Sequence, residues 1–370
     1  MAAEHDPQQM TRLTPLAEVT ARIDALVKQI TPRRVAVATA LGRVLSEDVV
    51  AGAAVPASAR ALRDGFAVAA EALSDASSYA PVQLVPPQRV DAGEVLPAGT
   101  DAVAPLDTVV ERDGRFSSIA PVAPGDGVLT AGGDVGAGTL VRRAGTVVRA
   151  TDLAALAAAG IAEVAVCAPR VCVAPARAGH DPIITAAVEL LAGAVAAAGG
   201  VVRRCADGAA ALTDAEADAI IVLGGTGVGR RDTSVRALAA VGEVNVRGVA
   251  LMPGETAAFG MVGQRPVLLV PGRLDAALAV WLTLGRHLLV RLTGGSGDVL
   301  GTSAALARKH ASPLGLAEVV PVHLSDGQAE PIASGYWPLQ AMARANGWIL
   351  VPGDSEGYPA GAEVVIRALP

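Results

Sequence analysis

The amino-acid sequence predicts a multidomain protein that combines an α/β domain with mostly β segments. Three observations lead to this fold class. Strand-like and helix-like runs alternate between residues 171 and 292, and a glycine-rich turn directly follows one of the strands. The flanking segments, about 35–145 and 298–370, contain short apolar runs separated by Pro and Gly. Alternation is typical of a three-layer domain with a mainly parallel sheet, whereas short runs between frequent turns are typical of β modules.

In chain order, a helix comes first. We expect Thr14 as its N-cap and Pro15 as its first residue, because apolar residues recur at helical spacing from Leu16 to Ile30. From about 35 to 145 the apolar runs are too short for helices, and turns recur at Asp113-Gly114, Pro124-Gly125 and Gly132-Gly133. A short helix, 152–159, is expected next, capped by Thr151 and ended by Gly160.

The α/β part follows. Strands are expected at 171–174, 201–202, 220–223 and 267–270, and helices at 183–198 and about 275–292. Residues 183–202 have the length of a membrane span, but Glu189 and the many alanines and glycines favour a helix buried against a sheet. Residues 293–297 are expected to form a linker, and 319–322, 348–351 and 363–366 are strand candidates in the tail.

Composition limits the function classes. The chain has 370 residues, 52% of them hydrophobic, so it can bury a large core in two to four domains. A net charge of −6 gives no support for nucleic-acid binding. Its three cysteines, Cys167, Cys172 and Cys205, form no CxxC pair, so neither a zinc site nor a disulfide framework is expected. The polar N-terminus does not resemble a signal peptide, and we expect a cytoplasmic protein without a membrane segment.

The glycine-rich turn indicates a binding site. Gly224, Gly225, Gly227 and Gly229 follow the strand at 220–223, and Arg230, Arg231 and Asp232 are expected to open a helix. A strand, a glycine loop and a helix N-terminus together can bind phosphate, although a plain tight turn is the alternative. The loop matches neither the dinucleotide fingerprint nor the P-loop. Pro271-Gly272 ends the strand at 267–270, so we expect a ligand site between the two turns.

Six motifs in order resemble those of one family. They are 63–68 (RDGFAV), 93–103 (GEVLPAGTDAV), 132–135 (GGDV), 224–232 (GGTGVGRRD), Met252-Pro253-Gly254 with Phe259-Gly260, and Val270-Pro271-Gly272. In this respect the chain resembles the molybdopterin molybdenumtransferase family, the MoeA and gephyrin E-domain proteins, over nearly its whole length.

The resemblance implies four parts. These are an extended N-terminal domain (1–47 with 136–168), an inserted β domain (48–135), a three-layer α/β domain like MoaB and MogA that binds molybdopterin (169–296), and a C-terminal β barrel (297–370). It also implies a homodimer whose active site lies between the α/β domain of one subunit and the β domain of the other. The implied partners include a MogA-like adenylyltransferase and a client molybdoenzyme.

The implied reaction hydrolyses adenylylated molybdopterin, releases AMP and inserts molybdate into the dithiolene, with Mg²⁺. Asp64, Asp134 and Asp232 are the candidate catalytic residues, and Asp64 and Asp232 the candidate Mg²⁺ ligands, because phosphoanhydride hydrolysis needs a hard cation and a positioned water. Asp64 in a turn, Asp134 in a turn and Asp232 as a helix cap are the structural alternatives. The candidate cofactor-binding residues are Gly224, Gly225, Thr226, Gly227, Gly229, Arg230, Pro253, Gly254, Pro271, Gly272 and Arg273.

Several positions depart from the family pattern. Met252 and Glu255 stand where the family has two lysines, and Glu255 would bring negative charge to an anion site. The acidic segment after the first α/β strand is replaced by 174–184, with Asp181 as its nearest carboxylate. Arg230, Arg231 and Arg273 either restore positive charge or are solvated surface residues. His180 is more plausible as a loop residue than as a ligand.

Two hypotheses for the function remain open. In the first, the chain is an active molybdenumtransferase. In the second, it is a degenerate paralogue that binds molybdopterin or the finished cofactor as a carrier, without inserting metal. A purely structural scaffold has little support, because no appended domain or long linker is evident in the sequence.

Overall fold

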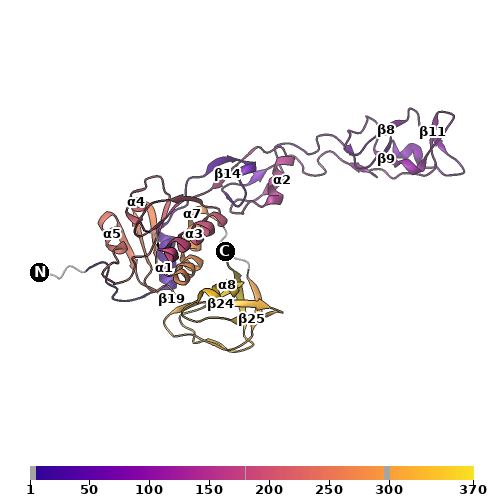
Figure 1. Cartoon of the computed structure of the whole chain (residues 1–370). Coiled ribbons are helices and arrows are strands. Elements are labelled where there is room, and N and C mark those ends of the chain that lie inside the picture. The colour runs from indigo at the N-terminus through magenta and orange to yellow at the C-terminus, as the bar shows by residue number, and fades with distance from the viewer. Residues whose placement is uncertain (1–5, 180, 296–300) are drawn as a thin grey trace.

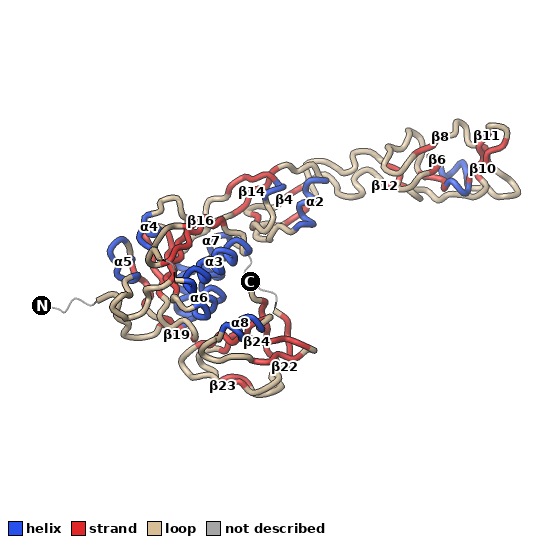
Figure 2. Tube along the Cα trace, in the orientation of Figure 1, coloured by secondary structure: helices blue, strands red, loops and turns tan. Residues whose placement is uncertain are grey.

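The computed structural model describes residues 6–179, 181–295 and 301–370. It is elongated: a compact body carries an arm that ends in a small β domain (Figure 1). The body contains the α/β domain and the C-terminal barrel, and the chain runs out along the arm and back before the α/β domain begins (Figure 2).

The α/β domain is built on one mixed sheet in the order β16-β15-β17-β21-β20-β18. The first four strands are parallel: β16 (Val201–Arg204), β15 (Arg170–Pro175), β17 (Ala219–Leu223) and β21 (Arg265–Val270). These confirm the four predicted strands. Two antiparallel strands that the sequence analysis did not predict, β20 (Ala258–Val262) and β18 (Glu243–Arg247), complete the sheet.

Helices cover this sheet. They are α3 (Pro182–Ala197), α4 (Gly208–Thr213), α5 (Ser234–Val241), α6 (Leu274–Val280) and α7 (Arg286–Thr293), the last two continuous through a π turn at Trp281–Gly285. Leu191 and Val195 of α3 are fully buried, which confirms the predicted buried helix. The run Leu274–Thr293 is apolar and long enough to span a membrane, but 72% of its most apolar window is buried inside the protein, as in a core helix.

The first helix, α1 (Leu16–Leu26), packs into the same core through Val19 and Ile23. The predicted cap was wrong. Thr14 and Pro15 form a short strand, β1, that pairs with β19 (Val249–Met252), so Pro15 precedes the helix and no side chain caps it. The helix also ends earlier than predicted, because Val27 is extended.

The arm begins with a small domain. Its sheet has the strand order β2-β14-β3, with bounds Arg33–Ala36, Glu163–Cys167 and Val44–Leu45. The short 3-10 helix Val37–Thr39 directly follows β2. The helix α2 (Ala150–Ala158) lies beside it and is not capped by Thr151. Instead the backbone N–H of Arg149 donates to Asp152 at 2.8 Å, so the carboxylate three residues into the helix reaches back. Gly160, with φ of +73°, ends the helix region as predicted.

A ribbon of β4 (Val49–Val50) and β13 (Leu140–Arg142) leads to the distal β domain. There β6 (Gly65–Val68) lies between β8 (Gln88–Val90) and β9 (Ala102–Pro105). The other strands are β7 (Val82–Gln83), β10 (Val109–Arg112) and β11 (Arg115–Ser118) in one sheet, and β5 (Arg60–Ala61) with β12 (Val128–Leu129) in another. Short 3-10 helices lie at Ala70–Leu73 and Leu106–Thr108. This domain has its own core around Phe66 and Leu73.

The tail forms the predicted barrel. Five strands close on themselves in the order β24-β25-β22-β28-β26, because β24 also pairs with β26. Their bounds are Ala317–Ser325, Gln328–Pro331, Thr302–Leu306, Glu363–Ala368 and Gly347–Val351; β23 (His310–Ala311), β27 (Gly357–Tyr358) and α8 (Leu339–Arg344) lie outside the barrel ring. Strand β19 pairs with β24 and so ties the barrel to the α/β domain.

One expectation about the cysteines was wrong. Cys172 of β15 and Cys205, just after β16, are joined by a disulfide across 33 residues of sequence, and Cys167 is free and buried. Cys172 lies on β15 and Cys205 directly follows β16, the neighbouring parallel strand, a relation that their spacing in the sequence does not reveal. Of the predicted linker, residues 296–297 lie outside the described residues.

Candidate ligand-binding site at the carboxyl edge of the sheet

The two glycine turns meet where β17 and β21 end. A Cβ placed on Gly272 would lie 3.3 Å from the Cα of Gly224 and 2.8 Å from Cδ1 of Ile184, at the start of α3. Gly224 has φ of +90° and Gly225 of +65°, a backbone region that favours glycine. The predicted neighbourhood of the two turns is therefore confirmed: the close approach excludes a side chain at Gly272, and the positive φ disfavours one at Gly224.

The glycine loop is closed by Asp232, which does not open the following helix. Its Oδ2 accepts a hydrogen bond from the backbone N–H of Gly229 at 2.9 Å, and a Cβ on Gly227 would lie 2.6 Å from the same oxygen. Helix α5 begins only at Ser234. The predicted helix start at 230–232 was therefore wrong, because these residues still belong to the turn. Asp232 keeps its other oxygen, Oδ1, without a hydrogen bond from the described residues.

The N-terminus of α5 is already occupied. The side-chain carbonyl of Gln8 accepts from the backbone N–H groups of Val235 and Arg236 at 3.2 and 3.3 Å. Its amide nitrogen donates to the carbonyls of Gly225 and Gly227 at 3.1 and 2.6 Å. Gln8 is only 2% exposed, so these helix amides are not open to a phosphate as the sequence analysis expected. Anion binding here must use other groups.

Arg247 connects the glycine loop to the neighbouring Pro253-Gly254 turn. It donates to the carbonyl of Thr226 at 2.7 Å, to that of Thr256 at 2.9 Å and to that of Gln8 at 3.0 Å. The hydroxyls of Thr226 and Thr256 also lie 2.9 Å apart. Burial lowers the pKa of Arg247, while the charge of Asp232 opposes that shift. Arg247 therefore holds the loop in place, and its guanidinium donates its hydrogen bonds to backbone carbonyls of the protein.

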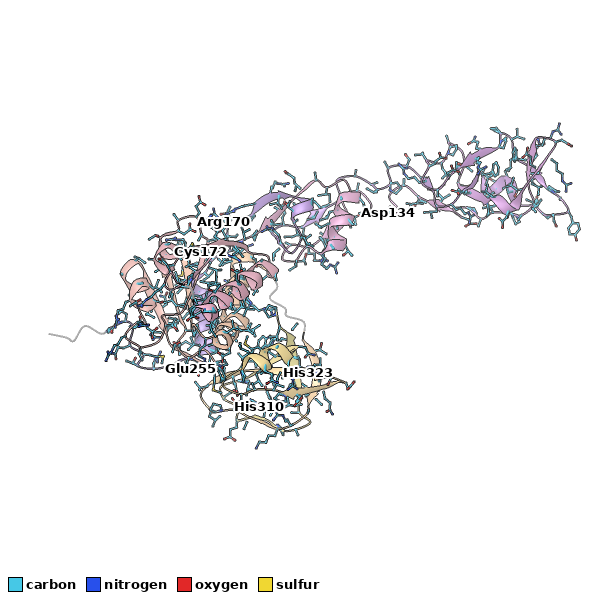
Figure 3. All side chains as sticks on the ribbon, viewed as in Figure 1. Asp134, Arg170, Cys172, Glu255, His310 and His323 are labelled. Atoms are coloured by element: carbon cyan, nitrogen blue, oxygen red, sulfur yellow. A yellow bond between two sulfur atoms is a disulfide. The ribbon has the colours of Figure 1, made fainter. Side chains whose placement is uncertain are left out.

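Glu255 brings negative charge to the Pro253-Gly254 turn. Its Oε2 accepts from the backbone N–H of Gly254 at 3.0 Å, and Gly254, with φ of +139°, packs against Val280 of α6. Figure 3 shows Glu255 on the side of the α/β domain that faces the barrel. The carboxylate thus accepts the hydrogen bond of a backbone amide that could otherwise contact an anion. This agrees with the expectation that Glu255 brings negative charge to the turn.

Arg273 does not provide a free positive charge. Its guanidinium pairs with Asp275 at 2.5 Å, and Asp275 is 2% exposed and also accepts from the backbone N–H of Trp337 at 3.1 Å. The hydrogen bond that Arg273 donates to Asp275 raises the pKa of Arg273. Arg273 also lies over the ring of Tyr336, 5.1 Å from its centroid. Neither role considered for Arg273 in the sequence analysis describes this arrangement, in which Arg273 links the α/β domain to the barrel through Asp275 and Tyr336.

Three other arginines remain available at the loop. Arg230, Arg231 and Arg177 are exposed and form no ion pair with any residue that the structure describes, while Arg177 donates to the backbone carbonyl of Arg231. Because guanidinium groups bind phosphate and related oxyanions well, these three side chains keep the rim of the glycine loop cationic. Arg177 was not predicted as a site residue, although it lies in 174–184, the segment that replaces the acidic segment of the family.

The candidate carboxylates of the β domain lie far along the arm. Asp64 is exposed between β5 and β6, and its Oδ1 accepts from the backbone N–H of Ala92 at 2.8 Å. Asp134 is exposed on the arm (Figure 3). Neither residue approaches Asp232 within one chain, because the arm extends away from the body (Figure 1). A site that uses all three carboxylates therefore requires a second subunit.

Of the two remaining sequence candidates, Asp181 and His180, the structure describes Asp181. Asp181 caps α3, since its Oδ1 accepts from the backbone N–H of Ile183 at 2.9 Å. His180 lies outside the described residues. Gln8 and Arg247 were not predicted, and no sequence signal pointed to them. Asp275 could have been suspected, since it follows directly on the second glycine turn at the start of a helix.

One group in the described part of the chain has the spacing of a metal site. It consists of Cys172, Cys205 and Asp214, whose ligand atoms lie within 4.8 Å of one another. The two sulfurs are bonded to each other, and Asp214 pairs with Arg203 at 2.8 Å. Disulfide sulfurs carry no thiolate, so this group has no free ligand set.

Comparison with known proteins agrees with the geometry. Three family models match in order: "MoeA N-terminal region (domain I and II)" over residues 14–160, "Probable molybdopterin binding domain" over 181–291, and "MoeA C-terminal region (domain IV)" over 303–369. The chain is 29% identical to molybdopterin molybdenumtransferase 2 of Mycobacterium tuberculosis, with 90% of this chain and 94% of the relative covered. It is 26% identical to the molybdopterin molybdenumtransferase of Haemophilus influenzae over 69% and 71% of the two chains.

The whole structure has a similar solved counterpart. The crystal structure of a molybdopterin biosynthesis MoeA protein from Pyrococcus horikoshii superposes with a TM-score of 0.75 at 25% identity, and the match covers 97% of this chain and 100% of the other. The arm, the α/β domain and the barrel therefore occur together in a known architecture.

Proposed function

Because this chain belongs to the MoeA family and so to molybdenum cofactor biosynthesis, we propose that it inserts molybdate into adenylylated molybdopterin and releases AMP. One observation carries the proposal. The two glycine turns meet at the carboxyl edge of the sheet, next to three exposed arginines that form no ion pair with the described residues, Arg177, Arg230 and Arg231. Ligands of α/β sheets bind at this edge, and guanidinium groups suit the phosphates of the substrate.

The site is completed by a second copy of the chain in this proposal. The β domain of one subunit would bring Asp64 and Asp134 to the glycine loop and Asp232 of the other. Such an arrangement would give the exposed carboxylates of Asp64 and Asp134 a function. It would also explain why they lie far from Asp232 within one chain. We therefore propose a homodimer with two shared sites, in line with the symmetry usual for oligomers.

The donor set agrees with Mg²⁺. Asp64 and Asp232 each commit one carboxylate oxygen to a backbone N–H, and each keeps a second oxygen without a hydrogen bond from the described residues. Carboxylate oxygens are the ligands that Mg²⁺ prefers, so Asp64 and Asp232 would hold it. When bound, Mg²⁺ would neutralise charge on the phosphoanhydride and orient a water.

The protein residues have separate tasks in the reaction. The arginines of the glycine loop would bind the phosphates, and Arg247 with Gln8 would hold the loop in place for them. Water adds to phosphorus, the bond between the adenylate and the pterin phosphate breaks, and AMP leaves. The two dithiolene sulfurs then bind molybdenum in place of two molybdate oxygens, which take up protons from the thiols and the solvent and leave as water. We place the reaction in the cytoplasm, next to a MogA-like adenylyltransferase that supplies the adenylate.

A carrier function is the second candidate, and Glu255 favours it. Its carboxylate accepts the Gly254 N–H at 3.0 Å at a position where the family has a lysine, so the protein would bind the pterin but repel molybdate. In that case the chain would deliver molybdopterin or the finished cofactor to a client molybdoenzyme.

Purified protein with adenylylated molybdopterin, Mg²⁺ and molybdate separates these functions. Insertion predicts AMP release that is lost in Asp64→Ala and Asp232→Ala but kept in Asp107→Ala, an exposed control on the β domain. Tight pterin binding without AMP release would establish the carrier, and the absence of pterin binding would refute both candidates.

Mixing variants tests the shared site directly. If Asp64→Ala and Asp232→Ala subunits exchange freely, half of the dimers are mixed and each mixed dimer has one intact site, so about a quarter of the activity should return. No recovery despite subunit exchange would refute a site built from two subunits.

A further inference from the structure

A second cavity lies on the opposite edge of the α/β domain from the glycine loop. Its volume is about 480 Å³, and it is lined by the ends of α3 and α7, by α1, by the arm at Gly42 and Gly145, and by barrel strands β26 and β28. Because α3 ends where β16 begins, this cavity faces the amino ends of the parallel strands. It therefore lies apart from the site proposed above.

The charged side chains that line this cavity are both positive among the described residues. They are Arg286 and Arg367; His287 also lines the cavity, and no aspartate or glutamate of the described residues does. His287 is engaged outside the lining, at 2.9 Å from Asp24. Arg286 forms no hydrogen bond or ion pair with the described residues, although it is half-buried. Burial lowers its pKa, and the like charge of Arg367 lowers it further.

Two guanidinium groups thus face one partly enclosed space with no carboxylate from the described residues between them. Partial desolvation and mutual repulsion both disfavour the arrangement. An anion bound between them would remove both costs and form charge-assisted hydrogen bonds. The two guanidinium groups therefore favour a ligand whose anionic group binds between them.

The rest of the wall is apolar. Trp348 lies under Arg367, 5.1 Å from the guanidinium to the ring, and Leu282, Leu289 and Leu350 continue the surface. A cavity of this size accommodates a small organic molecule, since ligand sites typically measure about 300–1,000 Å³. The wall favours a ligand with a flat or aliphatic body beside its anionic group.

We propose that this cavity is a binding site for a small molecule that carries a carboxylate or phosphate on an apolar body, with Arg286 and Arg367 holding the anion and Trp348 the body. The site does not depend on molybdopterin chemistry, so its test is independent of the function proposed above. A ligand here contacts the α/β domain, the arm and the barrel at once.

Calorimetric titration of the full-length protein with 1-naphthoate and naphthyl phosphate tests the site. We expect one-to-one binding of at least one of them, with the tighter probe identifying the preferred anion. The neutral 1-naphthalenemethanol should bind at least about tenfold more weakly. No saturable binding of either anion, or equal binding of the neutral analogue, would overturn the proposal.

Variants locate the binding. Arg286→Gln and Arg367→Gln should each weaken the naphthyl anion at least about tenfold, and Arg286→Lys should restore part of the affinity. Arg291→Gln is the matched control, because Arg291 lies on the same helix but pairs with Asp24 outside the lining. Unchanged affinity in Arg286→Gln and Arg367→Gln would overturn the assignment.

Two further readouts exclude a purely structural explanation. Arg286→Gln should melt at the same temperature as the parent protein or higher, since it removes a like-charge contact; a lower melting temperature would show that Arg286 has an internal partner and would refute the site. If Arg286→Gln instead changes the oligomeric state in analytical ultracentrifugation, a second copy fills the cavity and the small-molecule proposal is wrong.

Discussion

Replacing Gln8 should loosen the glycine loop, which is the main structural feature of the candidate site. The side chain makes four hydrogen bonds, two from its amide to the carbonyls of Gly225 and Gly227 and two to its carbonyl from Val235 and Arg236. A buried hydrogen bond contributes about 0.5–1.5 kcal/mol net. Since the two bonds to the helix are long, at 3.2 and 3.3 Å, we expect Gln8→Ala to reduce the local opening free energy by about 2–4 kcal/mol.

Hydrogen exchange with mass spectrometry measures this quantity. A loss of 2–4 kcal/mol corresponds to exchange about 30- to 800-fold faster in peptides covering residues 225–236. The control is Gln9→Ala, because Gln9 is exposed and no hydrogen bond of its side chain occurs within the described residues. Gln8→Glu should act like Gln8→Ala, since a carboxylate oxygen would face the carbonyls of Gly225 and Gly227. Exchange in 225–236 that changes less than about threefold in a folded Gln8→Ala protein would refute the reasoning.

Three further predictions concern charge. Burial alone would raise the pKa of Glu318, which is fully buried, but hydrogen bonds led by that from His310 lower it; its contribution to stability is therefore complete above the ordinary carboxyl range and lost below about pH 4. The melting temperature should fall there, and Glu318→Gln should flatten the dependence; an unchanged pH profile would contradict this. Glu255→Lys should raise molybdate affinity about tenfold by calorimetry, since a reversed charge is worth a few kcal/mol before solvent screening; equal affinity would show that anions do not approach the turn. Asp152→Ala should cost about 1–2 kcal/mol in urea unfolding, because it removes the bonds to Arg149; the hydrogen bond from Arg149 lowers the pKa of Asp152, so the difference from the parent should shrink below about pH 4, and a constant difference would contradict it.

Much of the fold was predictable because its determinants are local. The strands at 171–174, 220–223 and 267–270 are continuous apolar runs, and glycine turns directly follow the last two of them. The rule that parallel strands share a carboxyl edge was then sufficient to bring Gly224 and Gly272 together. Three of the five barrel strands were predicted in the same way, from short apolar runs at 319–322, 348–351 and 363–366, whereas β22 and β25 were not predicted.

The details of the site depended on residues far apart in sequence. Gln8 is separated from Gly225 by 217 positions, and the sequence gives no signal for that contact. Asp232 was expected to open a helix, because its bond to Gly229 depends on the shape of the turn. Arg273 was considered a source of positive charge, and only the structure shows the buried Asp275 that neutralises it. In the proposed function, the roles of Asp64 and Asp134 would depend on a second chain, which one sequence does not display.

The pairing of β19 with β24 has a consequence for how the molecule unfolds. Residues of α1, of the α/β domain and of one side of the barrel, including Trp281, Trp337 and Trp348, belong to one apolar cluster, and alternate residues of β24 join it to the cluster inside the barrel; the distal β domain has a separate cluster around Phe66. Cooperative units follow contiguous cores. Calorimetry should therefore resolve two transitions, in which the barrel melts together with the α/β domain and the end of the arm melts independently of both.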